Sequence, residues 1–197
     1  MSRWSDAIQS VAPLPDYMII DGTRISTEGR STIEVNDPGS GLKLCDVPAA
    51  TVDDVANAVT AAGKALTGPW ANIPPRQRGQ LLWAAGTRIR EDAERLTLIE
   101  TLETGKSLKE AQASVERSAD YFCYYAGIVD KLQGETIPLG ANKVCFTELV
   151  PVGVTAHIVP WNVPLSTIAR GLAPALACGN VAVIKPAEDT PISAVLL

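Results

Sequence analysis

Val154-Thr155-Ala156-His157-Ile158-Val159 and Val181-Ala182-Val183-Ile184 are short apolar runs on either side of a segment with helical periodicity, from about Leu165 to Ala177. Apolar runs without alternation are typical of parallel strands that are covered on both faces. A strand, a helix and a second strand in this order form the unit from which open parallel sheets are built. The sequence therefore predicts an α/β fold with a doubly wound parallel sheet.

Polar side chains follow both predicted strands, at the sheet edge where such folds bind ligands. Asn162 lies between Pro160 and Pro164, which stiffen the backbone around it. Such an amide can donate to a developing oxyanion, although an asparagine that only closes a turn is the simpler interpretation. Lys185 and Glu188 can hold two ribose hydroxyls, but they can equally form a solvated surface ion pair.

The composition predicts an ordinary soluble globular chain. It has 197 residues, of which 46% are hydrophobic and 20% charged, enough for one core. The net charge is −5, and Lys and Arg are scattered, so we expect neither a nucleic acid nor an anionic membrane as partner. No apolar run approaches the roughly 18 residues that cross a bilayer. The first residues lack the apolar segment of an export signal, which predicts a cytoplasmic location.

Cysteine and histidine give no sign of a metal site. The four cysteines show no CxxC spacing, and the chain has a single histidine, so we predict reduced, mostly buried thiols and no metal. That histidine, His157, lies inside an apolar strand, where a packed and hydrogen-bonded side chain is expected rather than a catalytic base. Gly105-Lys106-Ser107 is similar to the end of a P-loop. It lacks the earlier glycine and the preceding strand, and is better interpreted as a capped helix junction.

The first two-thirds of the chain predict hairpins followed by helices. Turn residues separate short alternating runs between Tyr17 and Pro48, which is typical of antiparallel hairpins. Thr51 is the expected N-cap of an amphipathic helix, and Ser107 opens a longer helix with a capping box. Between them, helices are expected after Pro74-Pro75 and from Asp92 to a left-handed cap at Gly105. The first helix is expected to bury an apolar stripe made of Val52, Val55, Ala56, Val59 and Ala62.

Residues 134–154 are rich in β-branched residues and turns, and predict a two-stranded ribbon. Because a lone ribbon is marginally stable in water, it must lie on the body of this protein or on a second subunit.

Thr190-Pro191 predicts another helix, with a hydroxyl N-cap and a proline at the first helical position. Its first N–H groups would be available to a phosphate. The apolar stripe of this helix is interrupted at Leu197, so we expect the chain to be the N-terminal part of a longer protein.

Several of these segments together resemble the aldehyde dehydrogenase superfamily. The resemblance is carried by four ordered segments, namely residues 148–154, Pro160-Trp161-Asn162-Val163-Pro164, residues 174–180 and Lys185-Pro186-Ala187-Glu188-Asp189-Thr190-Pro191. A weaker similarity extends back to near Tyr17. It implies NAD(P)-dependent oxidation of an aldehyde to a carboxylic acid through a cysteine thiohemiacetal.

The resemblance also assigns roles to individual residues. Asn162 matches the oxyanion-stabilising asparagine, and Lys185 and Glu188 match the positions that hold the adenine ribose. The cofactor is expected to run along the strand end formed by Ile158, Val159, Pro160 and Trp161. A carboxylate at Glu188 would repel a 2′-phosphate, which favours NAD over NADP without excluding NADP.

The division of the chain follows from the same resemblance. Residues 1–130 would begin the NAD-binding domain, residues 131–152 would form an arm for a homodimer or homotetramer, and residues 153–197 would start a Rossmann-like core. The nucleophilic cysteine and the glutamate base belong beyond Leu197, and Cys178 occupies a place for a small buried residue. The isolated chain is therefore expected to be inactive; the alternative is a truncated, non-catalytic interaction or dimerisation chain.

Overall fold

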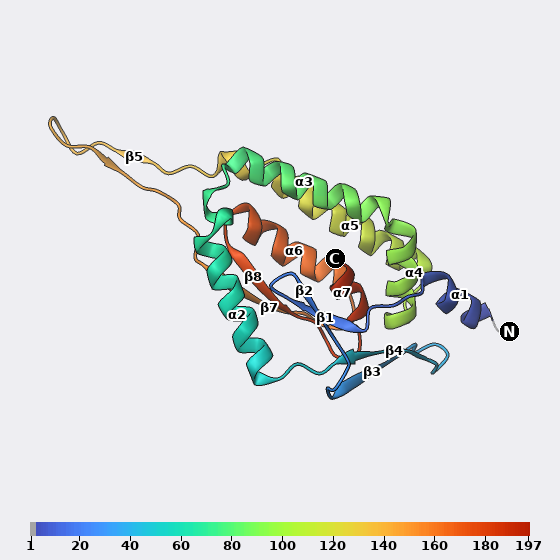
Figure 1. Ribbon diagram of the computed structural model, residues 1–197. Coiled ribbons are helices and arrows are strands. Elements are labelled where there is room, and N and C mark those ends of the chain that lie inside the picture. The colour runs from blue at the N-terminus through green and yellow to red at the C-terminus, as the bar shows by residue number, and fades with distance from the viewer. Residues whose placement is uncertain (1–2) are drawn as a thin grey trace.

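A computed structural model describes residues 3–197 and shows a helical layer packed beside a small parallel sheet, with a ribbon projecting from the body (Figure 1). The helices are α1 (Arg3–Val11), α2 (Val52–Thr67), α3 (Pro75–Glu91), α4 (Ala93–Thr104), α5 (Leu108–Ala126), α6 (Pro164–Ala177) and α7 (Ile192–Leu196), with 3-10 turns η1 (Pro69–Asn72) and η2 (Val129–Lys131). The strands are β1 (Tyr17–Ile20), β2 (Thr23–Ser26), β3 (Thr32–Asn36), β4 (Lys43–Pro48), β5 (Thr136–Ile137), β6 (Cys145–Phe146), β7 (Val154–Ile158) and β8 (Val181–Lys185).

Two antiparallel hairpins form the N-terminal part, as the turn residues predict. β1 pairs with β2 through a two-residue turn in which Asp21 and Gly22 have φ of 53° and 71°. Positive φ at both turn residues matches the right-handed twist of the strands. β3 pairs with β4 around a loop that the buried Asp37 organises, because its carboxylate accepts from the N–H groups of Gly39 and Ser40.

The caps predicted at Thr51, Ser107 and Gly105 are confirmed. The Thr51 hydroxyl accepts from the N–H of Asp54 while the Asp54 carboxylate accepts from the N–H of Thr51, and Ser107 and Glu110 form the same box at α5. Gly105 ends α4 in the left-handed conformation, at φ 74°. Lys106 then turns inward to the buried carboxylate of Glu100, with Nζ and Oε1 2.7 Å apart. Residues 105–107 are thus a capped junction between two helices.

Glycines allow α3 to approach α5 closely. A Cβ at Gly86 would lie 2.7 Å from the Cys123 sulfur, and one at Gly79 would lie 2.7 Å from the Ala126 carbonyl oxygen. The core between the helices is lined by Leu82, Ile89, Val115, Phe122 and, from α6, Leu165.

The parallel strands β7 and β8 are confirmed, with Val154 opposite Val181 and Ile158 opposite Lys185. The residues just before the two strands are joined by a hydrogen bond, in which Asn180 Oδ1 accepts from the N–H of Gly153 at 2.9 Å. The prediction that both faces are covered is wrong for β7, where alternate residues are exposed and Ile158 reaches 82%, whereas Val181 to Ile184 of β8 are buried or half-buried. In the described part of the chain the sheet has two strands, and no further strand covers the side of β7 away from β8.

The predicted direction of the apolar stripe of α2 is also wrong. Ala62 is buried, but Val52, Val55 and Val59 are exposed, at 86%, 54% and 47%. α2 contacts β7 and β8, yet its valine side faces solvent. The periodicity gave the helix correctly but not the neighbour that its apolar side meets.

The ribbon forms as predicted. β5 pairs antiparallel with β6, and the segment extends far from the helices and sheet (Figure 1). Its large apolar side chains are exposed, among them Leu139, Val144, Phe146 and Val150.

Candidate functional site

The loops that follow β7 and β8 leave the sheet side by side. Ile158 pairs with Lys185 at the last position of the two strands, and the N–H of Val159 donates to the carbonyl of Lys185 at 3.0 Å. Parallel pairing therefore brings the segments that contain Asn162 and Glu188 to the same edge of the sheet, as the sequence predicts.

A buried hydroxyl joins these two loops. Thr190, which is 1% exposed, donates from Oγ1 to the carbonyl of Trp161 at 3.2 Å. The prediction that Thr190 caps the following helix is wrong: the N-cap of α7 is Pro191, and no side chain next to it in sequence caps the helix. Local propensity favoured a cap, but the Thr190 hydroxyl donates instead to a carbonyl 29 residues earlier in the chain.

Glu103 of α4 caps α7 from across the core. Its carboxylate accepts from the N–H of Ile192 at 2.8 Å and from the N–H of Ser193 at 3.2 Å. Burial raises the pKa of Glu103 to about 7, although these donors favour its charged form. The expectation that the first N–H groups of this helix are free for a phosphate is therefore wrong.

Sequence reasoning missed Glu103, although a signal was present. Glu100 and Glu103 fall at helical spacing on the same stripe as Leu96 and Ile99, and all four are buried. An acid on a buried stripe requires a partner, because an unpaired buried charge is very costly.

The residues expected along the cofactor lie at this edge with different exposures. Val159 is buried, at 4%, whereas Ile158 and Trp161 are 82% and 58% exposed. Pro160 and Asn162 are exposed as well. The amide of Asn162 is therefore on an accessible loop whose backbone is held at the preceding residue, Trp161.

Lys185 and Glu188 are paired with each other. Lys185 Nζ lies 2.5 Å from Glu188 Oε1, and both side chains are more than half exposed. The hydrogen bond from Lys185 lowers the pKa of the Glu188 carboxyl. This is the geometry of a surface ion pair, and it also leaves both groups accessible to a ligand at the sheet edge.

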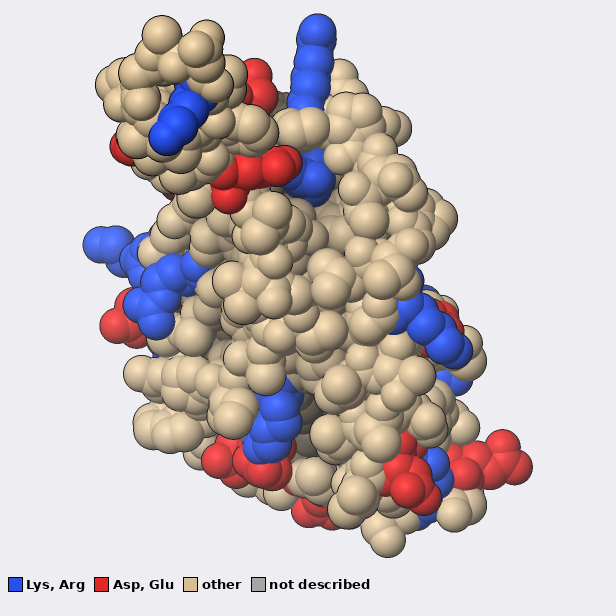
Figure 2. Space-filling view, turned by 90° about the vertical axis from the view of Figure 1, so that its left-hand side faces the viewer, with Lys and Arg blue, Asp and Glu red and all other residues tan. Residues whose placement is uncertain are grey.

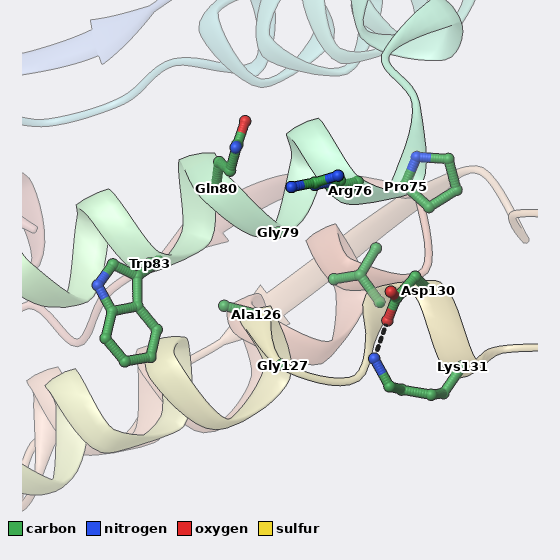
Figure 3. A pocket seen from close by; sticks show the side chains of 10 residues that line it. Pro75, Arg76, Gly79, Gln80, Trp83, Ala126, Gly127, Asp130 and Lys131 are labelled. Carbon is green, nitrogen blue, oxygen red and sulfur yellow. Dashed lines mark hydrogen bonds and ion pairs between the residues drawn. The ribbon is translucent and has the colours of Figure 1, made fainter.

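Two hollows of the described surface lie away from this edge. One of about 270 Å³ is situated between α3 and α5 near the start of the ribbon, and Trp83, Gln80 and Asp130 are among its lining residues (Figure 3). A second, of about 360 Å³, is lined by tyrosines of α5 and by Arg117. Neither contains a residue predicted for the site.

His157 is tied into the sheet, as predicted. Its Nε2 lies 3.0 Å from the Thr155 hydroxyl, which itself donates to the carbonyl of Val181 at 2.8 Å. The ring is half-buried against Gly171 of α6, so it has a packing role.

All four cysteines are free, but the prediction of mostly buried thiols is wrong. Cys45, Cys123 and Cys145 are half-buried, and Cys178 is exposed rather than buried. Cys178 follows the last residue of α6, whereas Asn162 precedes the first, so about 21 Å of helix separates them. Burial raises the pKa of the Cys45 thiol to about 11.

The described residues, 3–197, show no concentration of basic charge on the face in view, no metal cluster and no membrane-spanning helix. Lys and Arg are dispersed among acids and uncharged residues on the face shown in Figure 2. The described residues include no cluster of three or more His, Cys, Asp or Glu side chains suited to a metal. Among the described helices, none combines the length and the apolar character needed to span a membrane.

Comparison with known proteins identifies the family. Residues 25–197 match the model of the aldehyde dehydrogenase family. The chain belongs to this family. Its curated relatives include hydroxyisobutyraldehyde dehydrogenase of Mycolicibacterium austroafricanum, 39% identical over 91% of this chain and 36% of that protein. Retinaldehyde dehydrogenase 3 of Mus musculus is 41% identical over 89% of this chain and 33% of that protein.

Solved structures agree with the fold. Betaine aldehyde dehydrogenase of Staphylococcus aureus, in complex with NAD+, superposes with a TM-score of 0.93 at 33% identity, covering 98% of this chain and 39% of that one. An aldehyde dehydrogenase of Brucella melitensis gives a TM-score of 0.89 at 35% identity, covering 94% and 38%. The α/β fold expected from the resemblance is thus confirmed, and the chain spans about a third of the length of the curated relatives it matches.

Proposed function

We propose that the protein takes part in NAD(P)-dependent oxidation of an aldehyde to a carboxylic acid, with the β7–β8 edge supplying part of the cofactor and oxyanion site. The observation that supports this most directly is the pairing of Ile158 with Lys185, which puts the Asn162 loop beside the Lys185–Glu188 loop in a chain of this family. Family membership supports the reaction class, and the geometry of the sheet edge supports the roles proposed for these residues.

The roles follow from the chemistry of each group. Asn162 would donate its side-chain N–H to the oxygen of a carbonyl under attack, where one such donor is worth about 2.7–4 kcal/mol. Lys185 and Glu188 would exchange their mutual contact for two ribose hydroxyls. NAD would supply the hydride acceptor when bound, and the segment Ile158–Trp161 at the end of β7 would lie along it. The Glu188 carboxylate would repel a 2′-phosphate, which favours NAD over NADP.

We propose that the nucleophile is not one of the four cysteines of this chain, and the positions of Cys178 and Cys45 support this. Cys178 is separated from Asn162 by the whole of α6. Cys45 has its thiol pKa raised to about 11 by burial and is therefore protonated at neutral pH. Residues 1–197 alone are thus proposed to lack the acyl-transfer step.

The test uses the gene product that contains this chain, a panel of aldehydes and NAD or NADP. Asn162→Ala is expected to lower kcat about 10²–10³-fold with little change in NAD affinity. Lys185→Ala and Glu188→Ala are expected to weaken NAD binding more than they change kcat. Matched controls are Asn72→Ala, an exposed asparagine on η1, and Arg88→Ala or Glu91→Ala, from an exposed ion pair on α3. Equal losses of kcat and NAD affinity in Asn162→Ala would mean that Asn162 is only a turn residue.

A second proposal concerns self-association. The ribbon exposes a run of large apolar side chains that nothing in residues 3–197 covers, and the outer edges of its two strands are free to pair. We infer that residues 131–152 bind a second copy of the protein, in a homodimer or homotetramer.

A further inference from the structure

Two buried polar contacts hold the candidate cofactor loops. The first is the hydrogen bond from the Thr190 hydroxyl to the carbonyl of Trp161, the residue before Asn162. Thr190 is the second residue after Glu188, so this bond links the Lys185–Glu188 loop directly to the Asn162 loop. Because Thr190 is only 1% exposed, water does not compete for its hydroxyl.

The second contact fixes the far end of the same loop. Glu103, 2% exposed, binds the backbone N–H groups of Ile192 and Ser193, just after Thr190 and Pro191. Its own helix is anchored in the core, since Ile99 and Leu102 of α4 are 1% and 3% exposed. The loop after β8 therefore runs between two fixed points, the strand end at Lys185 and the Glu103 carboxylate.

Neither residue can be explained as a local helix cap. Thr190 stands where a cap is expected but donates elsewhere, and Glu103 reaches α7 from a helix 89 residues earlier in the chain. Thr190 binds the backbone carbonyl of Trp161, which lies in the Asn162 loop. Glu103 binds the backbone N–H groups of Ile192 and Ser193, which follow the Lys185–Glu188 loop. Between these anchors the Lys185–Glu188 pair is exposed, so its position depends on the backbone that carries it.

We propose that Thr190 and Glu103 are positioning residues for dinucleotide binding, which hold the Lys185–Glu188 loop in register with the Asn162 loop. They touch neither cofactor nor substrate. Their effect is preorganisation: a loop that is already ordered loses less conformational freedom when the ligand binds. This inference rests on the function proposed above.

The variants remove each contact with little change of shape. Thr190→Val deletes the hydroxyl and leaves the Trp161 carbonyl without that donor, while Thr190→Ser keeps the hydroxyl and is the rescue variant. Glu103→Gln keeps the side-chain length but replaces one acceptor oxygen with an amide group that cannot accept. Matched controls are Thr97→Val on α4 and Asp54→Asn on α2, which change a buried hydroxyl and a buried acid that have no hydrogen bond to either loop.

The measurements are the dissociation constant of NAD and the urea midpoint of unfolding, in the gene product that contains this chain. Thr190→Val and Glu103→Gln are each expected to weaken NAD binding roughly three- to tenfold, the factor that one buried hydrogen bond represents. Thr190→Ser and both controls are expected to keep the wild-type affinity, even where their unfolding midpoints fall. Unchanged NAD affinity in Thr190→Val and Glu103→Gln, or affinity that follows the unfolding midpoint in all five variants, would overturn the proposal.

Amide hydrogen exchange separates failure of this inference from failure of the proposed function. If the wild-type protein does not bind NAD, the proposed function fails, and the dinucleotide role fails with it. If NAD binds, Thr190→Val is expected to speed exchange in residues 161–163 as well as in residues 187–190. If exchange rises only beside residue 190 while the protein binds NAD normally, the coupling of the two loops is refuted. The proposed function is then unaffected.

Discussion

At the residue scale, Gly171 is a position where one added carbon would crowd a neighbouring ring. A Cβ there would lie 2.6 Å from Nδ1 of His157, a ring held in place through Thr155. We expect Gly171→Ala to lower the free energy of unfolding by about 1–3 kcal/mol, as overpacking does, in urea denaturation. Gly63→Ala, in α2 with nothing within 4 Å, is the control and should stabilise by about 0.5–1 kcal/mol. Equal behaviour of the two variants would contradict the crowding at His157.

Lys106 supports a second prediction at this scale, because it neutralises a carboxylate that has no exposure to solvent. Glu100 is 0% exposed and accepts from Lys106 Nζ at 2.7 Å and from the Ser114 hydroxyl at 2.8 Å. Lys106→Met should cost about 3–5 kcal/mol, the penalty for leaving one member of a buried pair. The double variant Glu100→Gln with Lys106→Met should recover most of that loss. Strict additivity in this double-mutant cycle would show that the two side chains do not interact.

Residue roles could be predicted from the sequence where both partners are close in the chain. The capping boxes of Thr51 and Ser107 and the left-handed Gly105 involve neighbours within a few residues, so local chemistry determines them. Thr190 and Glu103 could not be assigned, because their partners lie 29 and 89 residues away and only the fold brings them together.

At the scale of elements, the junction of α4 with α7 should respond to pH. Burial raises the pKa of Glu103 from 4.5 to about 7, and the negative charge of the neighbouring Glu100 also raises it. The Glu103 carboxylate in turn contributes to the raised pKa of the Cys45 thiol on β4. The folded state therefore keeps a proton that the unfolded chain releases between these values, and stability falls as the pH rises from about 4.5 to 7. Glu103→Gln should lack this part of the slope in urea midpoints measured across that range. An identical slope in wild type and variant would refute the assignment.

The existence of elements was easier to predict than the surfaces they contact. Helical periodicity located α2 and α6, and unbroken apolar runs located β7 and β8. The same patterns gave the wrong surroundings for Val55 and Ile158, which are exposed. Periodicity reports which side of an element is apolar, but the neighbour that covers this side depends on the rest of the fold.

At the scale of the whole molecule, the ribbon is the feature that residues 3–197 do not stabilise by themselves (Figure 1). A two-stranded ribbon is marginal in water, and this one exposes Val144 at 86% and Phe146 at 67%. If a second copy covers it, the double variant Val144→Glu with Phe146→Glu should shift the protein toward monomer in sedimentation analysis and leave the helical circular dichroism unchanged. Val52→Glu with Val55→Glu is the matched control, since these valines of α2 are similarly exposed, at 86% and 54%. A monomeric wild-type protein would show that the ribbon does not bind a second copy. The same shift in both double variants would show that added charge weakens association wherever it is placed, so that the ribbon is not the specific contact.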